Sequence, residues 1–218
     1  MKILVIGNAD QLAECKLKFG PAVFDEACSS WSQAAARLGS ATMVFDFVSV
    51  DREESFTIPR GVSTLFVDTS RTTLGRWLQD HHPGDIRVYG FCCMRSFVNR
   101  DVLEVVVPRD GSVRELEIVC QSLGTAFQVV DDQVGMVSPR VIGMIINEAY
   151  YTLEEGTATR QDIDLAMKLG TNYPYGPFEW ADRIGLKNLV ALLEAVHRNT
   201  GDERYRVCPL LIEKARLS

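Results

Sequence analysis

The sequence predicts an α/β N-terminal domain with a mostly parallel sheet, followed by an all-α C-terminal domain. Through residue 131, short apolar runs rich in β-branched side chains alternate with amphipathic segments of helical spacing. This alternation with short links is typical of βαβ units. From Asp132 onward only helical spacing remains. We therefore expect two domains, at residues 1–131 and 132–218.

The expected strands are short and apolar, as buried strands of a parallel sheet are. The first, Lys2–Gly7, is rich in β-branched residues and ends on glycine. The other strands are expected at Ala22–Phe24, Thr42–Val50, Gly61–Val67, Ile86–Cys93, Val102–Val107 and Phe127–Val130.

The helices between these strands show apolar spacing and end at capping residues or glycines. They are expected at Asp10–Phe19, Ser30–Leu38, Thr72–Gln79 and Val113–Leu123. Ser29 or Ser30 supplies the cap of the second helix, and Gly124 ends the last.

The C-terminal domain is predicted to be a set of helices joined by short turns. The expected ranges are Val137–Glu154, Thr159–Leu169, Pro177–Ile184 and Leu186–Asn199. Thr159 with Asp162 three residues on is a capping-box variant, and Pro177 suits the first position of a helix.

Composition excludes several classes of function. The net charge of −6 and the absence of a Lys/Arg stripe argue against a nucleic-acid partner. No apolar run approaches the length of a membrane span, and no signal peptide is recognised, so we expect a cytoplasmic protein. The six cysteines follow no metal-ligand spacing, which predicts reduced thiols and no metal site.

The segment from Asn147 to Leu186 carries the most specific motifs. They are Asn147-Glu148-Ala149, Glu155-Gly156, Asp162-Ile163-Asp164 and the run from Gly176-Pro177-Phe178-Glu179 through Asp182 to Gly185-Leu186. This segment resembles the helical C-terminal domain of the 3-hydroxyacyl-CoA dehydrogenase family. The resemblance implies a Rossmann-like first domain, NAD as cofactor, acyl-CoA substrates of fatty-acid or related metabolism, and a dimer formed through these helices.

The loop after the first strand departs from the family's G-x-G-x-x-G pattern. Here the loop is Gly7-Asn8-Ala9-Asp10-Gln11-Leu12, so only the first glycine remains. Ala9 places a methyl group where the pyrophosphate would press, and Asp10 places a carboxylate at a helix N-terminus that otherwise attracts phosphate. The acid at the position of the ribose ligand is Asp25, although a solvated carboxylate at a strand end is the favoured interpretation of it. NAD binding is therefore expected to be weakened.

Most catalytic positions implied by the resemblance are also replaced. The segment Gly90-Phe91-Cys92-Cys93-Met94-Arg95 matches the family's G-x-H-F-F-N, so Cys92 stands where the base histidine would be. Glu104 remains at the position of the catalytic glutamate, and Ser70 at a substrate-binding serine. Pro139 takes the place of the family's active-site asparagine.

Several of these residues could have other chemical roles. Cys92 could be a nucleophile, but a thiol beside a carboxylate is mostly protonated at neutral pH, so filling a strand end is the favoured interpretation. Glu179 and Asp182 could bind a metal or act in acid–base catalysis, but helix capping and hydrogen bonds between helices are the favoured interpretation. The three histidines, His81, His82 and His197, are interpreted as surface residues and not as replacement bases.

Two classes of function follow. In the first, the protein is a degenerate, non-catalytic relative that binds a small molecule or dimerises, either with itself or with an active relative. In the second, it is an NAD-dependent oxidoreductase with altered chemistry. Only about sixteen residues link Asp25 to Thr42, where the family has a long helical insertion that contributes to acyl-CoA binding. The replacements and this deletion favour the first class, and whether the protein is an enzyme stays open.

Overall fold

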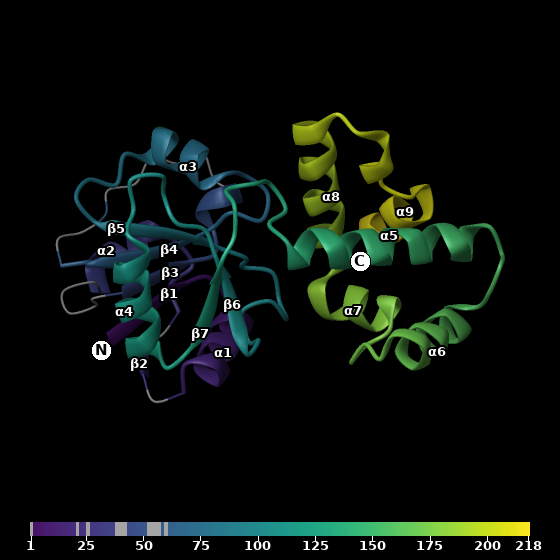
Figure 1. Ribbon diagram of the computed structural model, residues 1–218, viewed down its shortest axis with the longest axis horizontal. Coiled ribbons are helices and arrows are strands. Elements are labelled where there is room, and N and C mark those ends of the chain that lie inside the picture. The colour runs from purple at the N-terminus through teal and green to yellow at the C-terminus, as the bar shows by residue number, and fades with distance from the viewer. Residues whose placement is uncertain (1, 21, 25–26, 38–42, 52–57, 59–60) are drawn as a thin grey trace. The chain divides into compact units, whose positions relative to one another are not determined.

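The computed structural model describes residues 2–20, 22–24, 27–37, 43–51, 58 and 61–218. The chain forms two compact units, Met1–Met136 and Val137–Ser218. The sequence places the boundary slightly earlier, at 131/132. The predicted fold class, an α/β domain followed by a helical domain, is confirmed (Figure 1).

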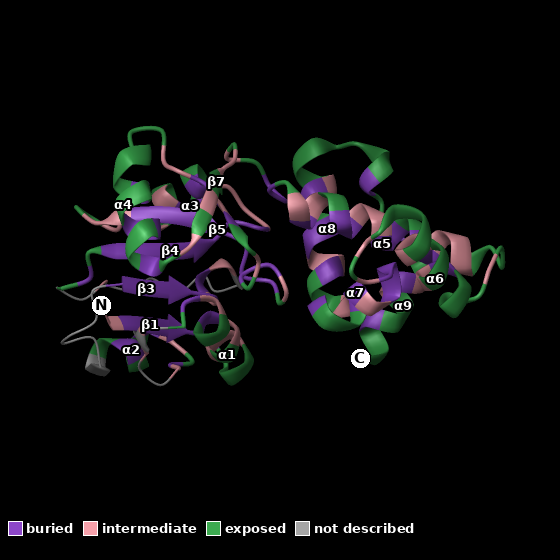
Figure 2. Cartoon of the chain, turned by 60° about the horizontal axis from the view of Figure 1, so that its bottom comes forward, coloured by how far each residue is buried: buried purple, intermediate pink, exposed green. Residues whose placement is uncertain are grey.

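The first unit is built on a five-stranded sheet in which every neighbouring pair is parallel. Its strands are β1 (Lys2–Ile6), β2 (Val23–Phe24), β3 (Met43–Asp46), β4 (Thr64–Asp68) and β5 (Arg87–Phe91), in the order β2-β1-β3-β4-β5. The middle strands β3 and β4 are buried along their whole length, as Figure 2 shows in purple. That burial explains why these strands read as continuous apolar runs without alternation.

A second, two-stranded parallel sheet consists of β6 (Val102–Val105) and β7 (Ala126–Val129). It is joined to β5 where Gly90 and Val106 exchange two backbone hydrogen bonds of 2.9 Å. A Cβ on Gly90 would lie 2.7 Å from Cγ2 of Thr69 and 3.0 Å from Cβ of Val106. Only glycine lets the two strands approach this closely.

The helices of the first unit follow the predicted order with small shifts at their ends. They are α1 (Ala9–Lys18), α2 (Trp31–Arg37), α3 (Leu74–His81) and α4 (Val113–Leu123). The predicted start of α3 at Thr72 was wrong because Thr73 is its N-cap, whose hydroxyl accepts from the Arg76 amide. Ser30 caps α2 by accepting from the Gln33 amide at 3.3 Å.

Strand β3 ends at Asp46, earlier than the predicted Val50, because the Asp46 side chain turns the chain. Its Oδ1 accepts from the amides of Val48 at 2.9 Å and Ser49 at 3.1 Å. These bonds compete with strand pairing. The chain instead enters a short 3₁₀ turn, Ser49–Asp51.

Aromatic rings fill the core of the first unit. Phe45 and Phe66 stack with centroids 4.6 Å apart, and Phe91 meets both edge-on. Phe19 of α1's C-terminal cap also packs on Phe45 at 5.0 Å. Such pairs stabilise beyond their buried area by about 0.5–1.5 kcal/mol each.

The second unit contains five helices and one 3₁₀ turn. They are α5 (Ser138–Glu154), α6 (Arg160–Thr171), α7 (Pro177–Ile184), α8 (Leu186–Thr200), the turn Glu203–Tyr205 and α9 (Pro209–Leu217). Helices α7, α8 and α9 all pack on α5. Helix α9 is an element that the sequence analysis missed, although Pro209 before three apolar residues is a recognisable helix start. Across the described ranges, no helix has both the length and the apolar character needed to cross a bilayer.

Candidate functional site

The candidate site lies at the carboxyl ends of the parallel strands. The loop from Gly7 follows β1, Ser70 follows β4 and Cys92 follows β5. Because these strands are parallel, all three segments reach the same edge of the sheet. Ligands of open α/β sheets bind at this edge, so the topology places the predicted residues at one end of the fold.

The loop after β1 is closed by its own side chains. The Asn8 amide donates to Oε1 of Gln11 at 2.9 Å, and the Gln11 amide donates to Oδ1 of Asn8 at 3.0 Å. The Gly7 amide donates to the Cys28 carbonyl at 2.7 Å. A helix N-terminus binds anions through its unsatisfied amides, and at α1 those of Asn8 and Gln11 are already satisfied.

The other residues of this loop also do not fit a dinucleotide. A Cβ on Gly7 would collide with the Gln11 side chain, so that side chain lies directly against the glycine. Leu12 packs on the edge of the aromatic core where a glycine would allow a closer helix. The Asp10 carboxylate in the first turn pairs with Arg95 at 3.8 Å, both side chains being mostly exposed. Asp25, the predicted ribose ligand, lies outside the described residues.

Ser70 is buried and already hydrogen-bonded. Its hydroxyl donates to Oδ2 of Asp68 at 3.0 Å, and its amide donates to Oδ1 of the same carboxylate at 3.0 Å. Its carbonyl accepts from the Gly135 amide at 2.9 Å. A hydroxyl in this position braces the turn after β4 and has no exposed face for a substrate.

Cys92 and Cys93 are buried thiols beside that same carboxylate. Burial raises the pKa of Cys92 well above its ordinary value, and the nearby Asp68 and Glu104 raise it further. Burial likewise raises the pKa of Cys93, whose amide donates to Oδ1 of Asp68 at 3.2 Å. Both groups are therefore neutral thiols at physiological pH and cannot replace an imidazole base.

Glu104 is half-buried on β6, close to both Cys92 and Arg100. Burial lowers the pKa of Arg100, while Glu104 and other neighbouring groups raise it. The Arg100 guanidinium lies over the Phe97 ring at 4.5 Å and donates to the Ser96 carbonyl at 3.2 Å. Glu104, at the position of the catalytic glutamate, therefore lies beside Arg100 and the neutral thiol of Cys92. The resemblance implies a histidine in place of that thiol.

Helix α1 holds the segment after β5 through residues that the sequence analysis did not identify. Oε1 of Glu14 accepts from the amides of Ser96 at 2.9 Å and Asn99 at 3.1 Å. Lys18 donates to the carbonyls of Arg100 and Asp101. With Asp10, these residues recur every four positions and therefore share one face of α1. The four-residue spacing is visible in the sequence, but nothing in the sequence indicates which segment this face of α1 contacts.

Pro139 belongs to the second unit. It is buried near the start of α5, in the first turn where its missing amide costs nothing, as expected. Its ring carries no amide to bind a substrate.

The carboxylates of the Gly176–Asp182 motif serve as caps and interhelix contacts, as predicted. Oε2 of Glu179 accepts from the Gly176 amide at 3.0 Å, and Oδ1 of Asp164 accepts from the Phe178 amide at 2.8 Å. Asp182 pairs with Arg160 of α6 at 2.5 Å. Within the described part of the chain, no group of three or more potential ligands could hold a metal ion.

The histidines lie away from Cys92 or in the other unit. His81 ends α3, in contrast to the predicted loop, because the helix continues past Gln79 and its ring stacks on Trp77 at 4.4 Å. His82 follows it, so both precede β5, whereas Cys92 follows that strand. His197 is on α8, 3.4 Å from Glu203. All six cysteines are buried and none forms a disulfide.

Comparisons with known proteins agree with the helical motifs. Residues 135–218 match the family model described as 3-hydroxyacyl-CoA dehydrogenase, C-terminal domain. The chain is 40% identical over 116 residues to 3-hydroxyadipyl-CoA dehydrogenase of Escherichia coli, covering 53% of this chain and 24% of that protein. It is 42% identical over 113 residues to 3-hydroxybutyryl-CoA dehydrogenase of Bradyrhizobium diazoefficiens, covering 52% and 39%. The chain thus spans less than half the length of these curated relatives.

A solved structure extends the likeness to the first unit. The (S)-3-hydroxybutyryl-CoA dehydrogenase of Ralstonia eutropha superposes with a TM-score of 0.69 over 99% of this chain and 93% of that one, at 20% identity. At this identity the superposition shows a shared fold. Residues 135–218 are therefore similar to the C-terminal domain of the 3-hydroxyacyl-CoA dehydrogenase family, and the chain as a whole shares the fold of a solved dehydrogenase of that kind.

Proposed function

We propose that this protein is a non-catalytic relative of the 3-hydroxyacyl-CoA dehydrogenases that keeps their scaffold without their hydride-transfer site. The observation that carries the proposal is the closed loop after β1, where Asn8 and Gln11 satisfy each other's amides. A pyrophosphate would have to displace both side chains and lie near the Asp10 carboxylate. NAD therefore does not fit this loop.

The positions for proton transfer support the same proposal. The base position holds Cys92, a buried thiol whose pKa is raised. Losing a general base costs on the order of 10² to 10⁴ in rate. The Ser70 hydroxyl is already hydrogen-bonded to Asp68. Because Cys92 stands at the histidine position, Glu104 has no imidazole to orient.

The remaining role is binding or association. The well-matched helical unit supports a homodimer, or a heterodimer with an active relative, and a small-molecule ligand other than NAD remains compatible with the fold. The six buried thiols suit a reducing cytosolic compartment.

A second candidate is an NAD-dependent oxidoreductase of fatty-acid or related acyl-CoA metabolism. The names of the relatives favour it, since those proteins are dehydrogenases of 3-hydroxyadipyl-CoA and 3-hydroxybutyryl-CoA. The retained Glu104 also favours it. Against it stands the closed loop, and the identity to these relatives covers only about half of the chain.

A ligand titration separates the two candidates. We expect no rise in the thermal midpoint with NAD, NADH or acetoacetyl-CoA, and no NADH oxidation with acetoacetyl-CoA by absorbance. A ligand at about 100 times its Kd would stabilise the native state by about 2.7 kcal/mol, which such an assay detects readily.

Gln11→Ala is the matched variant, because it removes the acceptor that occupies the Asn8 amide. NADH should raise the thermal midpoint of this variant at least as much as it raises that of the wild-type protein. A clear NADH shift together with turnover in the wild-type protein would refute the non-catalytic proposal.

A further inference from the structure

The segment between β5 and β6 is tethered to helix α1, about eighty residues earlier in the chain. Residues 94–101 of this segment form turns and bends and belong to neither a strand nor a helix. Oε1 of Glu14 accepts from the amides of Ser96 at 2.9 Å and Asn99 at 3.1 Å. One carboxylate oxygen therefore satisfies two backbone donors of a segment that has no ladder of its own.

A second side chain of α1 holds the far end of the same segment. The Lys18 ammonium donates to the Asp101 carbonyl at 3.1 Å, and also to the Arg100 carbonyl. Lys18 lies one turn after Glu14, on the same face of the helix. Between the two tethers, Phe97 and Val98 are buried. The segment is thus closed by two polar tethers and a small apolar contact.

The backbone at one of these tethers is strained. Ser96 has a φ of 75°, in the left-handed region that glycine adopts freely and other residues rarely. A residue stays in such a conformation only where its surroundings hold it, and strain of this kind is common in segments that move. The hydrogen bond from the Ser96 amide to Glu14 supplies this hold. Breaking that bond lets the strain relax.

The segment covers the thiol at the end of β5. Cys92 and Met94 are each 4% exposed. The Met94 amide hydrogen-bonds to the Cys92 sulfur, and the Arg100 guanidinium lies close enough to influence the charge of that thiol. Residues from both ends of the segment therefore meet at Cys92, and displacement of the segment exposes it.

We propose that residues 94–101 form a lid over the carboxyl end of β5, strained at Ser96 and held shut by Glu14 and Lys18. The lid opens as a unit while the sheet stays folded. In its closed state it keeps solutes away from Cys92. The lid is a property of the fold that operates whether or not NAD binds, so this proposal and the non-catalytic proposal can fail separately.

Alkylation of Cys92 by iodoacetamide in the folded full chain tests the lid. The labelling rate at one pH, followed by peptide mass spectrometry, reports the population of the open state. Glu14→Ala should speed the labelling about tenfold or more, because the partly buried Ser96 amide loses its acceptor. Lys18→Ala should act in the same direction. Hydrogen exchange of residues 94–101 should rise in parallel, and this readout does not depend on thiol chemistry.

Ser96→Gly distinguishes a strained lid from a loop that is merely packed. Glycine adopts a positive φ without strain, so the closed state should become more favourable. Cys92 should then be alkylated about threefold more slowly than in the wild type. The same substitution should offset part of the acceleration in the double variant E14A/S96G. A loop held only by packing would gain no protection from the loss of the serine side chain.

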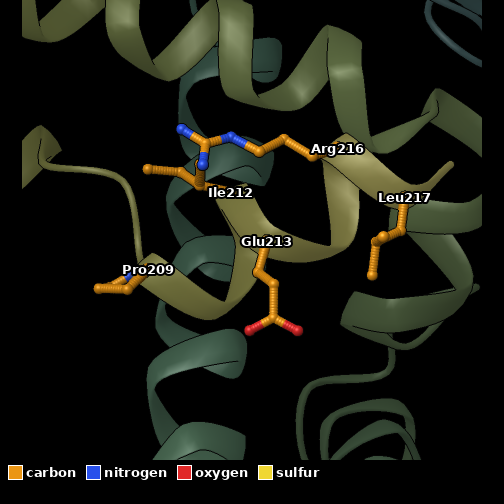
Figure 3. Close-up of a pocket in the computed structure, with 5 residues that line it drawn as sticks. All are labelled: Pro209, Ile212, Glu213, Arg216 and Leu217. Carbon is orange, nitrogen blue, oxygen red and sulfur yellow. The ribbon is translucent and has the colours of Figure 1, made fainter.

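Two matched controls remove the same side chains outside the tethers. Glu213→Ala is the control for Glu14→Ala, because Glu213 is exposed and belongs to the second unit. It lines an open groove of about 380 Å³ on α9 together with Pro209, Ile212, Arg216 and Leu217 (Figure 3). Lys16→Ala, on an exposed residue of α1, is the control for Lys18→Ala. Both controls should label at the wild-type rate.

Cys28 is the internal reference for unfolding of the first unit. Its thiol is buried, and its backbone bonds to Val5 and Gly7 beside β1. Its alkylation should be equal in all variants. Unchanged labelling of Cys92 in both Glu14→Ala and Lys18→Ala would overturn the lid, as would an equal acceleration at Cys28. A Ser96→Gly protein that labels faster than the wild type would also overturn it.

Discussion

Asp46 shows how individual residues hold the sheet edge together. Its Oδ2 accepts from the Trp31 indole at 2.8 Å, while its Oδ1 accepts from two backbone amides. Ser49 extends the network by accepting from the Trp77 indole at 3.0 Å. Burial raises the pKa of Asp46 even though these hydrogen bonds favour the ionised form.

This raised pKa makes the stability depend on pH in a defined direction. An exposed aspartate ionises near pH 4. Between that pH and the raised pKa of Asp46 the folded protein binds more protons than the unfolded chain, so the free energy of unfolding falls as pH rises. Asp46→Asn removes this component. The stability difference between wild type and variant should therefore shrink as pH increases from about 4.

A pH-independent loss should accompany this change. An asparagine that keeps both backbone bonds turns an N–H group toward the Trp31 indole, which costs about 1–3 kcal/mol. Urea unfolding across a pH series measures both effects, with the exposed Asp110→Asn as control. A stability difference that grows with pH would contradict the proposed protonation of Asp46.

At the scale of elements, the helical unit depends on buried polar contacts between helices distant in sequence. Asn147 of α5 is 2% exposed and uses both ends of its amide. Its Nδ2 donates to the Arg206 carbonyl and its Oδ1 accepts from the Cys208 amide, each at 2.9 Å. Glu154 continues the contact by accepting from the Leu210 amide at 3.0 Å in the first turn of α9.

Asn147→Ala should loosen the start of α9. The substitution leaves the buried Cys208 amide and the partly buried Arg206 carbonyl without their partner, and an unsatisfied buried group costs about 1–3 kcal/mol. Hydrogen exchange at the Cys208 amide should become faster, together with exchange through α9. Asn188→Ala, which removes only a local bond to the Ile184 carbonyl, is the control. Unchanged exchange in α9 would show that Asn147 does not fix this helix.

At the scale of the molecule, the two units have separate interiors. The first surrounds the aromatic cluster of the sheet, and the second surrounds α5. The buried residues of the second unit include Ile146, Phe178 and Leu192. Each unit has the core that an independently stable domain requires.

Local destabilisation should therefore stay within one unit. Asp46→Asn should speed amide exchange in the first unit and leave exchange in α8 unchanged. Asn147→Ala should speed exchange in the second unit and leave exchange in β4 unchanged. Native-state hydrogen exchange followed by mass spectrometry measures both in one protein. Equal acceleration in both units from either variant would show that they unfold together.

Much of the molecule was predictable from short-range patterns. The order of strands and helices, the Gly124 stop, the Thr159 cap and the position of Pro177 at the start of α7 follow from apolar spacing and capping chemistry, which act within a few residues. The replaced glycines of the β1 loop and the cysteine at position 92 were equally visible, because a motif is a local pattern.

The sequence by itself determined the fold class, the relationship of the helical unit and the residues that are missing from the site. Only the tertiary structure decided what the remaining residues do. Gln11 closes the loop, Ser70 is bonded to Asp68, and Glu14 holds the segment after β5. The physical reason is that burial and hydrogen bonding between distant segments set the availability and protonation of a side chain, and neither is encoded by its neighbours in sequence.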